Sequence, residues 1–135
     1  MTRRPRLTLL ASTALRPALA QPAPSAGPQG GRVVAGQAAI TTAPGRTTIT
    51  QGSDRAAIDW QRFDVGRNQT VQFQQPSAQS WTLNRVNSPD PSLIAGRVQA
   101  NGGVAIVNQS GVVFTPGAQV NVANLIASAS GITNQ

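Results

Sequence analysis

Four carboxylates are the side chains best suited to acid–base chemistry, because the 135-residue chain contains no His, Cys, Glu, Lys or Tyr. They are Asp54, Asp59, Asp64 and Asp90. Two carboxylates that cleave a glycosidic bond must face the same substrate. The five-residue spacing of the first three instead places consecutive members on opposite faces of a strand. We therefore expect no catalytic residue and no enzyme activity, and the missing thiolates and imidazoles predict no cofactor and no metal site.

The charge of the chain is strongly positive but unevenly distributed. Eleven Arg and four Asp give a formal net charge of +7, and four of the Arg lie within the first sixteen residues. From residue 21 onward, seven Arg face four Asp. No stretch interleaves Arg with aromatic side chains, which is the arrangement that binds single-stranded nucleic acid. The sequence therefore predicts no nucleic-acid partner.

The N-terminus has the three parts of a secretory signal. Arg3, Arg4 and Arg6 precede an apolar run at residues 7–15, and Ala18 and Ala20 supply the small residues of a cleavage site. The run is shorter than the roughly 20 residues needed to span a bilayer. We expect a signal peptide at residues 1–20, with a disordered basic N-terminus as the alternative, and a Pro- and Gly-rich linker at residues 21–30.

The remaining chain has the composition of β-structure. Val, Ile, Thr, Gln and Asn are interrupted by Gly and Pro, and no window keeps apolar residues at helical spacing for three turns. The alternation predicts ten short strands, at residues 32–39, 47–51, 56–60, 70–74, 81–86, 97–100, 104–107, 112–115, 119–123 and 125–127.

Residues 103–123 repeat with a constant step of eight. Each repeat places two large apolar residues two positions apart, and these pairs are Val104 and Ile106, Val112 and Phe114, and Val120 and Val122. Each segment therefore has one buried face. Three such strands fit the sides of one coil, about 20 to 25 residues long, in a parallel β-solenoid. An antiparallel meander also fits this spacing. The 8 Asn and 14 Gln favour the solenoid, because amides at successive corners can form hydrogen-bonded ladders.

Longer motifs carry a family resemblance. They are GRVVAGQAAI at residues 31–40, TITQ at 48–51, DRAAIDWQRFDVG at 54–66, VQFQQP at 71–76, LNRV at 83–86, PSLIAG at 91–96, ANG at 100–102 and VNQSGVVF at 107–114. In this order and at these spacings, they resemble the N-terminal two-partner secretion (TPS) domain of filamentous haemagglutinin-like exoproteins, the haemagglutination activity domain.

The resemblance implies a fold and a secretion-targeting function. The fold would be a right-handed parallel β-helix with an N-terminal cap over residues 31–135. POTRA domains of a dedicated outer-membrane barrel transporter would recognise the chain, which would fold outside a Gram-negative cell as part of a secreted or surface exoprotein or adhesin. Members usually continue for hundreds of residues, so we expect a fragment or a truncated gene product whose missing C-terminal repeats could contact a host-cell surface.

Residues 55–63 are the predicted recognition segment. Arg55 and Asp59 supply charge, while Trp60 and Phe63 supply large apolar groups. The alternative is that Trp60 and Phe63, with Ile58, plug the first coil and that Arg55 pairs with Asp59 at its surface.

A structural turn motif is predicted at Asn108, Gln109, Ser110 and Gly111, where many family members have Asn-Pro-Asn-Gly. Asn108 tolerates unusual backbone angles, and Gly111 has no Cβ to restrict them.

Two other functions compete with secretion targeting. A carbohydrate-active enzyme on a β-helix would need clustered carboxylates, which the sequence does not show. A glycan- or haem-binding adhesin domain is compatible with the family, but no site for either ligand is visible in the sequence, and Met1 is the single residue of a haem-ligating type.

Overall fold

The computed structural model describes residues 21–129, which form strands and connecting loops without a helix. The predicted signal peptide at residues 1–20 lies outside the described residues. Within the described range there is no helix that could span a membrane. The strands are β1 (Arg32–Ala35), β2 (Ala38–Ala43), β3 (Arg46–Gln51), β4 (Arg55–Trp60), β5 (Thr70–Gln74), β6 (Trp81–Val86), β7 (Ser92–Ile94), β8 (Arg97–Ala100), β9 (Gly103–Asn108), β10 (Val112–Phe114), β11 (Gln119–Asn121) and β12 (Asn124–Ser128).

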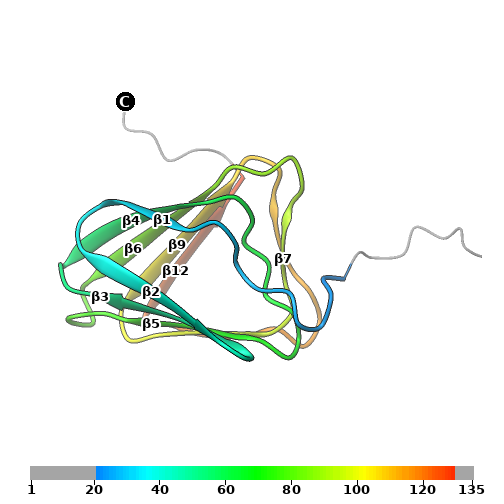
Figure 1. Cartoon of the computed structure of the whole chain (residues 1–135), viewed down its shortest axis with the longest axis horizontal. Coiled ribbons are helices and arrows are strands. Elements are labelled where there is room, and N and C mark those ends of the chain that lie inside the picture. Colours follow the sequence, from blue (N-terminus) through cyan, green and yellow to red (C-terminus); the bar gives the residue numbers. More distant parts are fainter. Residues whose placement is uncertain (1–20, 130–135) are drawn as a thin grey trace, which may run out of the picture.

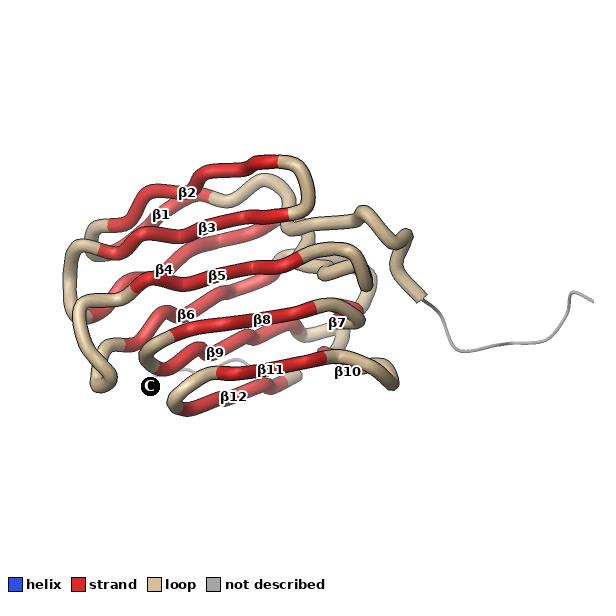
Figure 2. Tube along the Cα trace, turned by 90° about the horizontal axis from the view of Figure 1, so that it is seen from below, coloured by secondary structure: helices blue, strands red, loops and turns tan. Residues whose placement is uncertain are grey.

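The strands form the three sides of a solenoid, which Figure 1 shows along the direction of stacking. The β6 sheet has the order β1-β4-β6-β9-β12, and the β5 sheet has the order β11-β8-β5-β3-β2. The third side is the short β7 sheet, made of β7 and β10, and a parallel bridge between Val65 and Ile94 extends it into the first coil. Figure 2 shows the successive coils lying one below another.

The register confirms the parallel β-solenoid. Arg46 pairs with Thr70, Thr70 with Arg97, and Arg97 with Gln119, so one coil takes 24, 27 and then 22 residues. The 27-residue coil contains the longer loop between β5 and β6. From β3 and β4 onward, all pairs between the named strands are parallel. The antiparallel meander is therefore excluded.

An antiparallel cap closes the N-terminal end of the stack. β1 pairs with β4, and β2 pairs with β3, both in the antiparallel direction. The prediction of one strand at residues 32–39 is wrong, because the chain turns at Gly36 with φ +73°. A Cβ at Gly36 would lie 2.1 Å from the Arg55 carbonyl oxygen, so this turn requires glycine. Strand β7 was also not predicted.

The core lies inside the coils, where alternate residues of each strand point inward. Val104 and Ile106 are fully buried, and Val112, Val120 and Val122 pack against the core, as predicted. Phe114 differs, since 37% of it is exposed. Phe114 belongs to β10 in the third coil. The described part of the next coil contains only β11 and β12, so no described strand covers β10 on that side.

Residues 21–30 contain no named strand, but they lie against the first coil and hydrogen-bond to its backbone. The Gly66 amide donates to the Ala26 carbonyl at 2.8 Å, and the Asn68 amide donates to the Pro24 carbonyl at 3.0 Å. Gln29 forms an antiparallel bridge with Arg62. The division into a linker at residues 21–30 and a domain at 31–135 stays a prediction.

Candidate functional site

Two of the four predicted recognition residues lie inside the first coil. Trp60 is 2% exposed and Phe63 is 1% exposed, and their rings meet edge to face with centroids 5.4 Å apart. The Trp60 indole Nε1 donates to Asn84 Oδ1 at 2.9 Å, which satisfies a buried polar pair. Another molecule can therefore contact Trp60 and Phe63 only when the first coil is open.

Asp59 lies on the outer face of the β6 sheet and pairs with the next coil. Arg85 Nε donates to Asp59 Oδ1 at 2.8 Å, and Arg85 Nη2 donates to Asp59 Oδ2 at 3.1 Å. The two residues are parallel partners in β4 and β6. The alternative of an Arg55–Asp59 pair is wrong, because Asp59 forms its ion pair with Arg85, and four positions of extended strand place the Arg55 and Asp59 Cα atoms about 13 Å apart.

Arg55 borders a shallow apolar hollow on the same outer face. The hollow has a volume of about 270 Å³, and its lining also includes Ala35, Ala57, Trp81 and Leu83. A Cβ at Gly103 would lie 2.6 Å from the Trp81 ring, so this ring lies directly against the backbone of the next coil. The fold thus brings Arg55 to an exposed apolar surface and keeps it away from Trp60 and Phe63.

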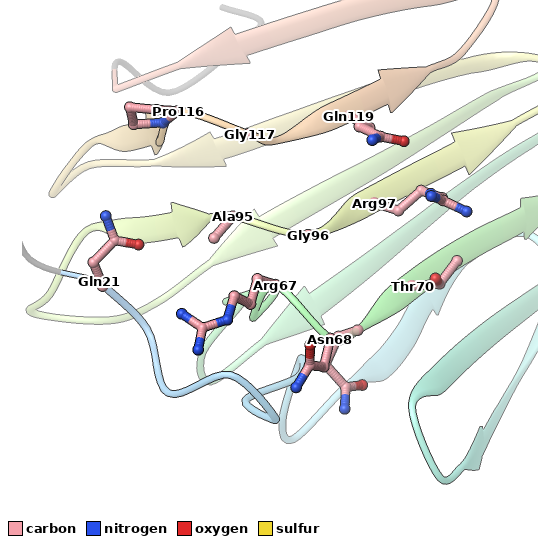
Figure 3. Close-up of a pocket in the computed structure, with 11 residues that line it drawn as sticks. Gln21, Arg67, Asn68, Thr70, Ala95, Gly96, Arg97, Pro116, Gly117 and Gln119 are labelled. Atoms are coloured by element: carbon pink, nitrogen blue, oxygen red, sulfur yellow. The ribbon is translucent and has the colours of Figure 1, made fainter.

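A polar hollow of about 600 Å³ lies where three successive coils enter the β5 sheet (Figure 3). Arg67, Arg97 and Gln119 line it together with Asn68, Gln69 and Thr70. This hollow was not predicted, because its residues come from segments about 22 to 27 positions apart, which the register between coils brings together.

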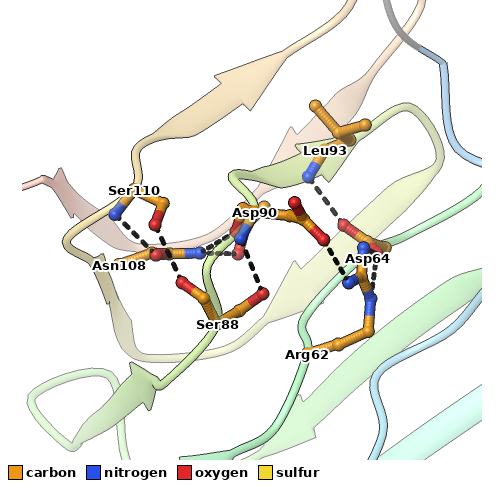
Figure 4. Close-up of polar contacts among 8 residues, drawn as sticks. Arg62, Asp64, Ser88, Asp90, Leu93, Asn108 and Ser110 are labelled. Carbon is orange, nitrogen blue, oxygen red and sulfur yellow. Dashed lines mark hydrogen bonds and ion pairs between the residues drawn. The ribbon is translucent and has the colours of Figure 1, made fainter.

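The predicted turn motif connects β9 to β10 (Figure 4). Asn108 is 1% exposed, and its Nδ2 donates to the Asp90 carbonyl at 3.1 Å and to Ser92 Oγ at 3.0 Å. Its Oδ1 accepts from the Ser110 amide, and its carbonyl accepts from the Gly111 amide, both at 2.8 Å. Gly111 has φ +109°, while Gln109 is exposed. Asn108 thus closes its own turn and ties it to the preceding coil.

The same corner holds a cluster of charges that the sequence did not predict (Figure 4). Arg62 Nη1 donates to Asp90 Oδ2 at 2.8 Å, and Arg62 Nη2 donates to Asp64 Oδ2 at 3.1 Å. Asp64 Oδ1 accepts from the Leu93 amide at 2.9 Å. The hydrogen bonds to Asp90 and Asp64 raise the pKa of Arg62 above its ordinary value. Arg62 and Asp64 in the first coil are therefore joined to Asp90 in the second, and this cluster connects the coils.

Two buried amides, Gln51 and Gln75, lie at the corner that leads into the β6 sheet, but Thr82 bridges them, so they do not form the amide-to-amide ladder that was predicted. Gln51 Nε2 donates to the Trp81 carbonyl at 3.1 Å, and Gln75 Nε2 donates to the Gly103 carbonyl at 2.8 Å, so each amide contacts the coil below. Thr82 links them, because its hydroxyl accepts from Gln75 Nε2 and donates to Gln51 Oε1. Among residues 21–129, no three His, Cys, Asp or Glu side chains are grouped so that they could hold a metal ion.

Comparisons with known proteins agree with this architecture. The family model of the TPS secretion domain matches residues 25–135. The crystal structure of the HMW1 secretion domain from Haemophilus influenzae superposes with a TM-score of 0.76 and 34% identity, covering 80% of this chain and 29% of that one. Two heme/hemopexin-binding proteins of Haemophilus influenzae are 45% and 43% identical over 101 and 102 residues. The matches cover 75% of this chain but 11% of each relative.

Proposed function

Because the chain belongs to the TPS secretion domain family, we propose that it directs a longer exoprotein to its own outer-membrane barrel transporter. The family match over residues 25–135 carries this proposal, since it includes the cap and every described coil. POTRA domains of the transporter bind the chain in the periplasm. The chain then passes through the barrel in an extended form, and the solenoid folds outside a Gram-negative cell. The exoprotein is then released or held at the cell surface.

Recognition by this route involves the chain before it folds. Trp60 and Phe63 are available to a partner only while the first coil is open, because the solenoid buries both rings. An unpaired strand can add to a sheet edge of a POTRA domain, where backbone hydrogen bonds give affinity and alternate side chains give specificity. Residues 55–63 would present Arg55 and Asp59 beside these two aromatic side chains.

The topology favours a folding reaction slow enough for capture. Parallel pairing joins residues far apart in sequence, such as Arg46 with Thr70 and Val65 with Ile94. Such non-local contacts require long loops to close before they stabilise the chain, and proteins rich in them fold slowly. Outside the cell, each coil buries its apolar face against the next, so folding opposes backward movement through the pore.

Transporter-dependent secretion tests this function. The full chain should reach the culture medium in a strain that expresses the cognate transporter, and it should stay periplasmic in the same strain without it. The measurement is an immunoblot of medium and periplasm, with a periplasmic enzyme as the leakage control. Equal secretion by both strains would refute the targeting function.

A pair of double variants tests the recognition segment separately. R55Q/D59N removes one cation and one anion from residues 55–63, and R46Q/D90N removes the same charges elsewhere. We expect at least a tenfold loss of secretion for the first pair and less than a twofold loss for the second, with unchanged circular dichroism of both purified proteins. Equal secretion of the two variants would refute the assignment of residues 55–63 and leave the targeting function standing.

A further inference from the structure

We propose that the outer edge of β2 pairs with β2 of a second copy of this chain, so that two solenoids join cap to cap in a two-fold symmetric dimer. β2 is the last strand of the β5 sheet, and no other described strand lies beyond it (Figure 2). Further coils of each copy would follow β12 at the opposite end of the stack, so they would extend away from the seam. This interaction is additional to export, because it requires the folded cap.

The backbone of β2 has a row of hydrogen-bonding groups along this edge. Just before β2, the Gln37 carbonyl accepts from the Gly52 amide at 2.8 Å, which directs it toward β3. The backbone groups of successive strand residues point in opposite directions. The N–H and C=O groups of Ala38, Ile40 and Thr42 therefore point away from β3, and no other segment of residues 21–129 pairs with them. Such a row is a template for another strand.

The other edge strand of the cap is protected against pairing, whereas β2 is not. β1 contains Arg32, and its register shifts between Val33 and Ala35. Charged residues and bulges are two common means of blocking an edge. β2 pairs with β3 through consecutive residues without a shift, and its sequence, Ala-Ala-Ile-Thr-Thr-Ala, contains no charge and no Pro. β2 is therefore a straight, uncharged edge.

A second copy of β2 complements this edge. In an antiparallel pair centred on Ile40, the Ile40 residues of the two copies face each other, and Ala38 of each copy faces Thr42 of the other. All the outward N–H and C=O groups of these residues are then paired. The half-buried Ala38 and Ile40 side chains, which pack against the core, lie on the same face of the joined sheet in both copies. No like charges meet in this seam.

The expected dimer is closed and weak. Two-fold pairing uses each β2 edge once, so assembly stops at two copies. One short strand pair buries less than the roughly 1,200 Å² of a stable interface, so we expect a dissociation constant of about 10–500 μM.

The opposite end of the stack is the rival contact. Phe114, Leu125 and Ile126 are exposed there by 37%, 41% and 44%. Further coils of a longer exoprotein would cover that end, whereas the cap would stay accessible. The experiment must therefore distinguish the two ends.

Sedimentation velocity of the purified full chain at increasing concentration tests the proposal. Thr42→Pro removes an outward N–H and places the Pro ring in the seam, but it removes no hydrogen bond to β3. The dissociation constant of the dimer should rise at least tenfold. Thr42→Ala is the matched control, because it loses the same hydroxyl but keeps the N–H, and its constant should stay within threefold of the parent.

Ala38→Pro tests the same seam independently. It removes the outward N–H at the first residue of β2, a position where a strand tolerates Pro. It should also weaken the dimer at least tenfold. Circular dichroism checks each variant, and if one Pro variant loses the β-sheet spectrum of the parent, the other decides.

Val34→Lys on β1 and Ile126→Lys on β12 place a charge on two other edge strands, at residues that are exposed. A dimer that the folded Pro variants weaken, and that Thr42→Ala, Val34→Lys and Ile126→Lys leave intact, would support the β2 seam. A parent chain that stays monomeric at about 1 mM, above the expected range, would overturn the proposal. So would a dimer that the Pro variants leave intact, equal losses in Thr42→Pro and Thr42→Ala, or dissociation by either Lys variant, which would assign the contact to β1 or to the C-terminal end.

Discussion

Replacing Trp60 by Ala should lower the free energy of unfolding of the purified chain by about 3–5 kcal/mol, the usual cost of removing a buried Trp side chain. The ring is almost fully buried, and it packs edge to face on Phe63. Its loss also leaves the fully buried Asn84 Oδ1 without the indole donor. Single domains are stable by about 5–15 kcal/mol, so this variant should unfold at a much lower urea concentration in a titration followed by circular dichroism.

Two further substitutions separate the causes of that loss. Trp60→Phe keeps an aromatic ring but removes the donor to Asn84, so it should cost about 1–3 kcal/mol. Trp81→Ala removes the half-buried indole on the outer face of the β6 sheet and should cost less than Trp60→Ala. If the Trp60→Ala variant were as stable as Trp81→Ala, Trp60 would not be the side chain that fills the core of the first coil.

Replacing Gly96 by Ala should be at least as damaging. A Cβ at this position would lie 2.1 Å from the Gly66 carbonyl oxygen and 2.5 Å from the Gln69 carbonyl oxygen. Both are backbone atoms of the coil above, so neither can rotate away, and the coils would have to separate. We expect a loss of about 4 kcal/mol or more, seen as a lower melting temperature or as the absence of a cooperative thermal transition in circular dichroism.

Gly52→Ala is the matched control for this effect. A Cβ at Gly52 would lie 3.3 Å from Gln37 Oε1, which is the mobile end of a side chain. Its melting temperature should stay within a few degrees of the parent. A Gly96→Ala variant that melts at the same temperature as Gly52→Ala would refute the close approach of the coils at this corner.

Local sequence patterns predicted most strands because their inward positions alternate. Strands β5, β6 and β8 begin and end at the predicted residues. Buried Val and Phe alternate with polar residues in β5 and β8, whereas in β6 the buried residues include polar Thr82 and Asn84. Strand β7 was missed because its three residues, Ser92 to Ile94, lie outside the eight-residue repeat that revealed the equally short β10 and β11. The division of the cap into β1 and β2 was missed because the turn at Gly36 depends on a close contact with Arg55, which is distant in sequence.

The contacts between side chains of different coils were less predictable than the strands, because they depend on the register between coils. Asp59 meets Arg85 only because β4 and β6 pair in parallel 26 residues apart. The link from Asp90 to Arg62 and the row from Thr70 through Arg97 to Gln119 arise in the same way. Once the parallel register is fixed, equivalent positions in successive coils identify such partners, whereas a single sequence without the register does not.

A disulfide lock between two coils tests most directly whether the chain crosses the transporter before it folds. The chain has no Cys. Thr48 and Gln72 are paired on neighbouring strands of the β5 sheet, where Cα atoms lie about 4.8 Å apart, within the range that a disulfide spans. With the transporter present, T48C/Q72C should accumulate in the periplasm in its oxidised form, and a reductant should restore its secretion. Each single-Cys variant should be secreted normally. Secretion of oxidised T48C/Q72C at the parental level would contradict the claim that the chain crosses the transporter before it folds.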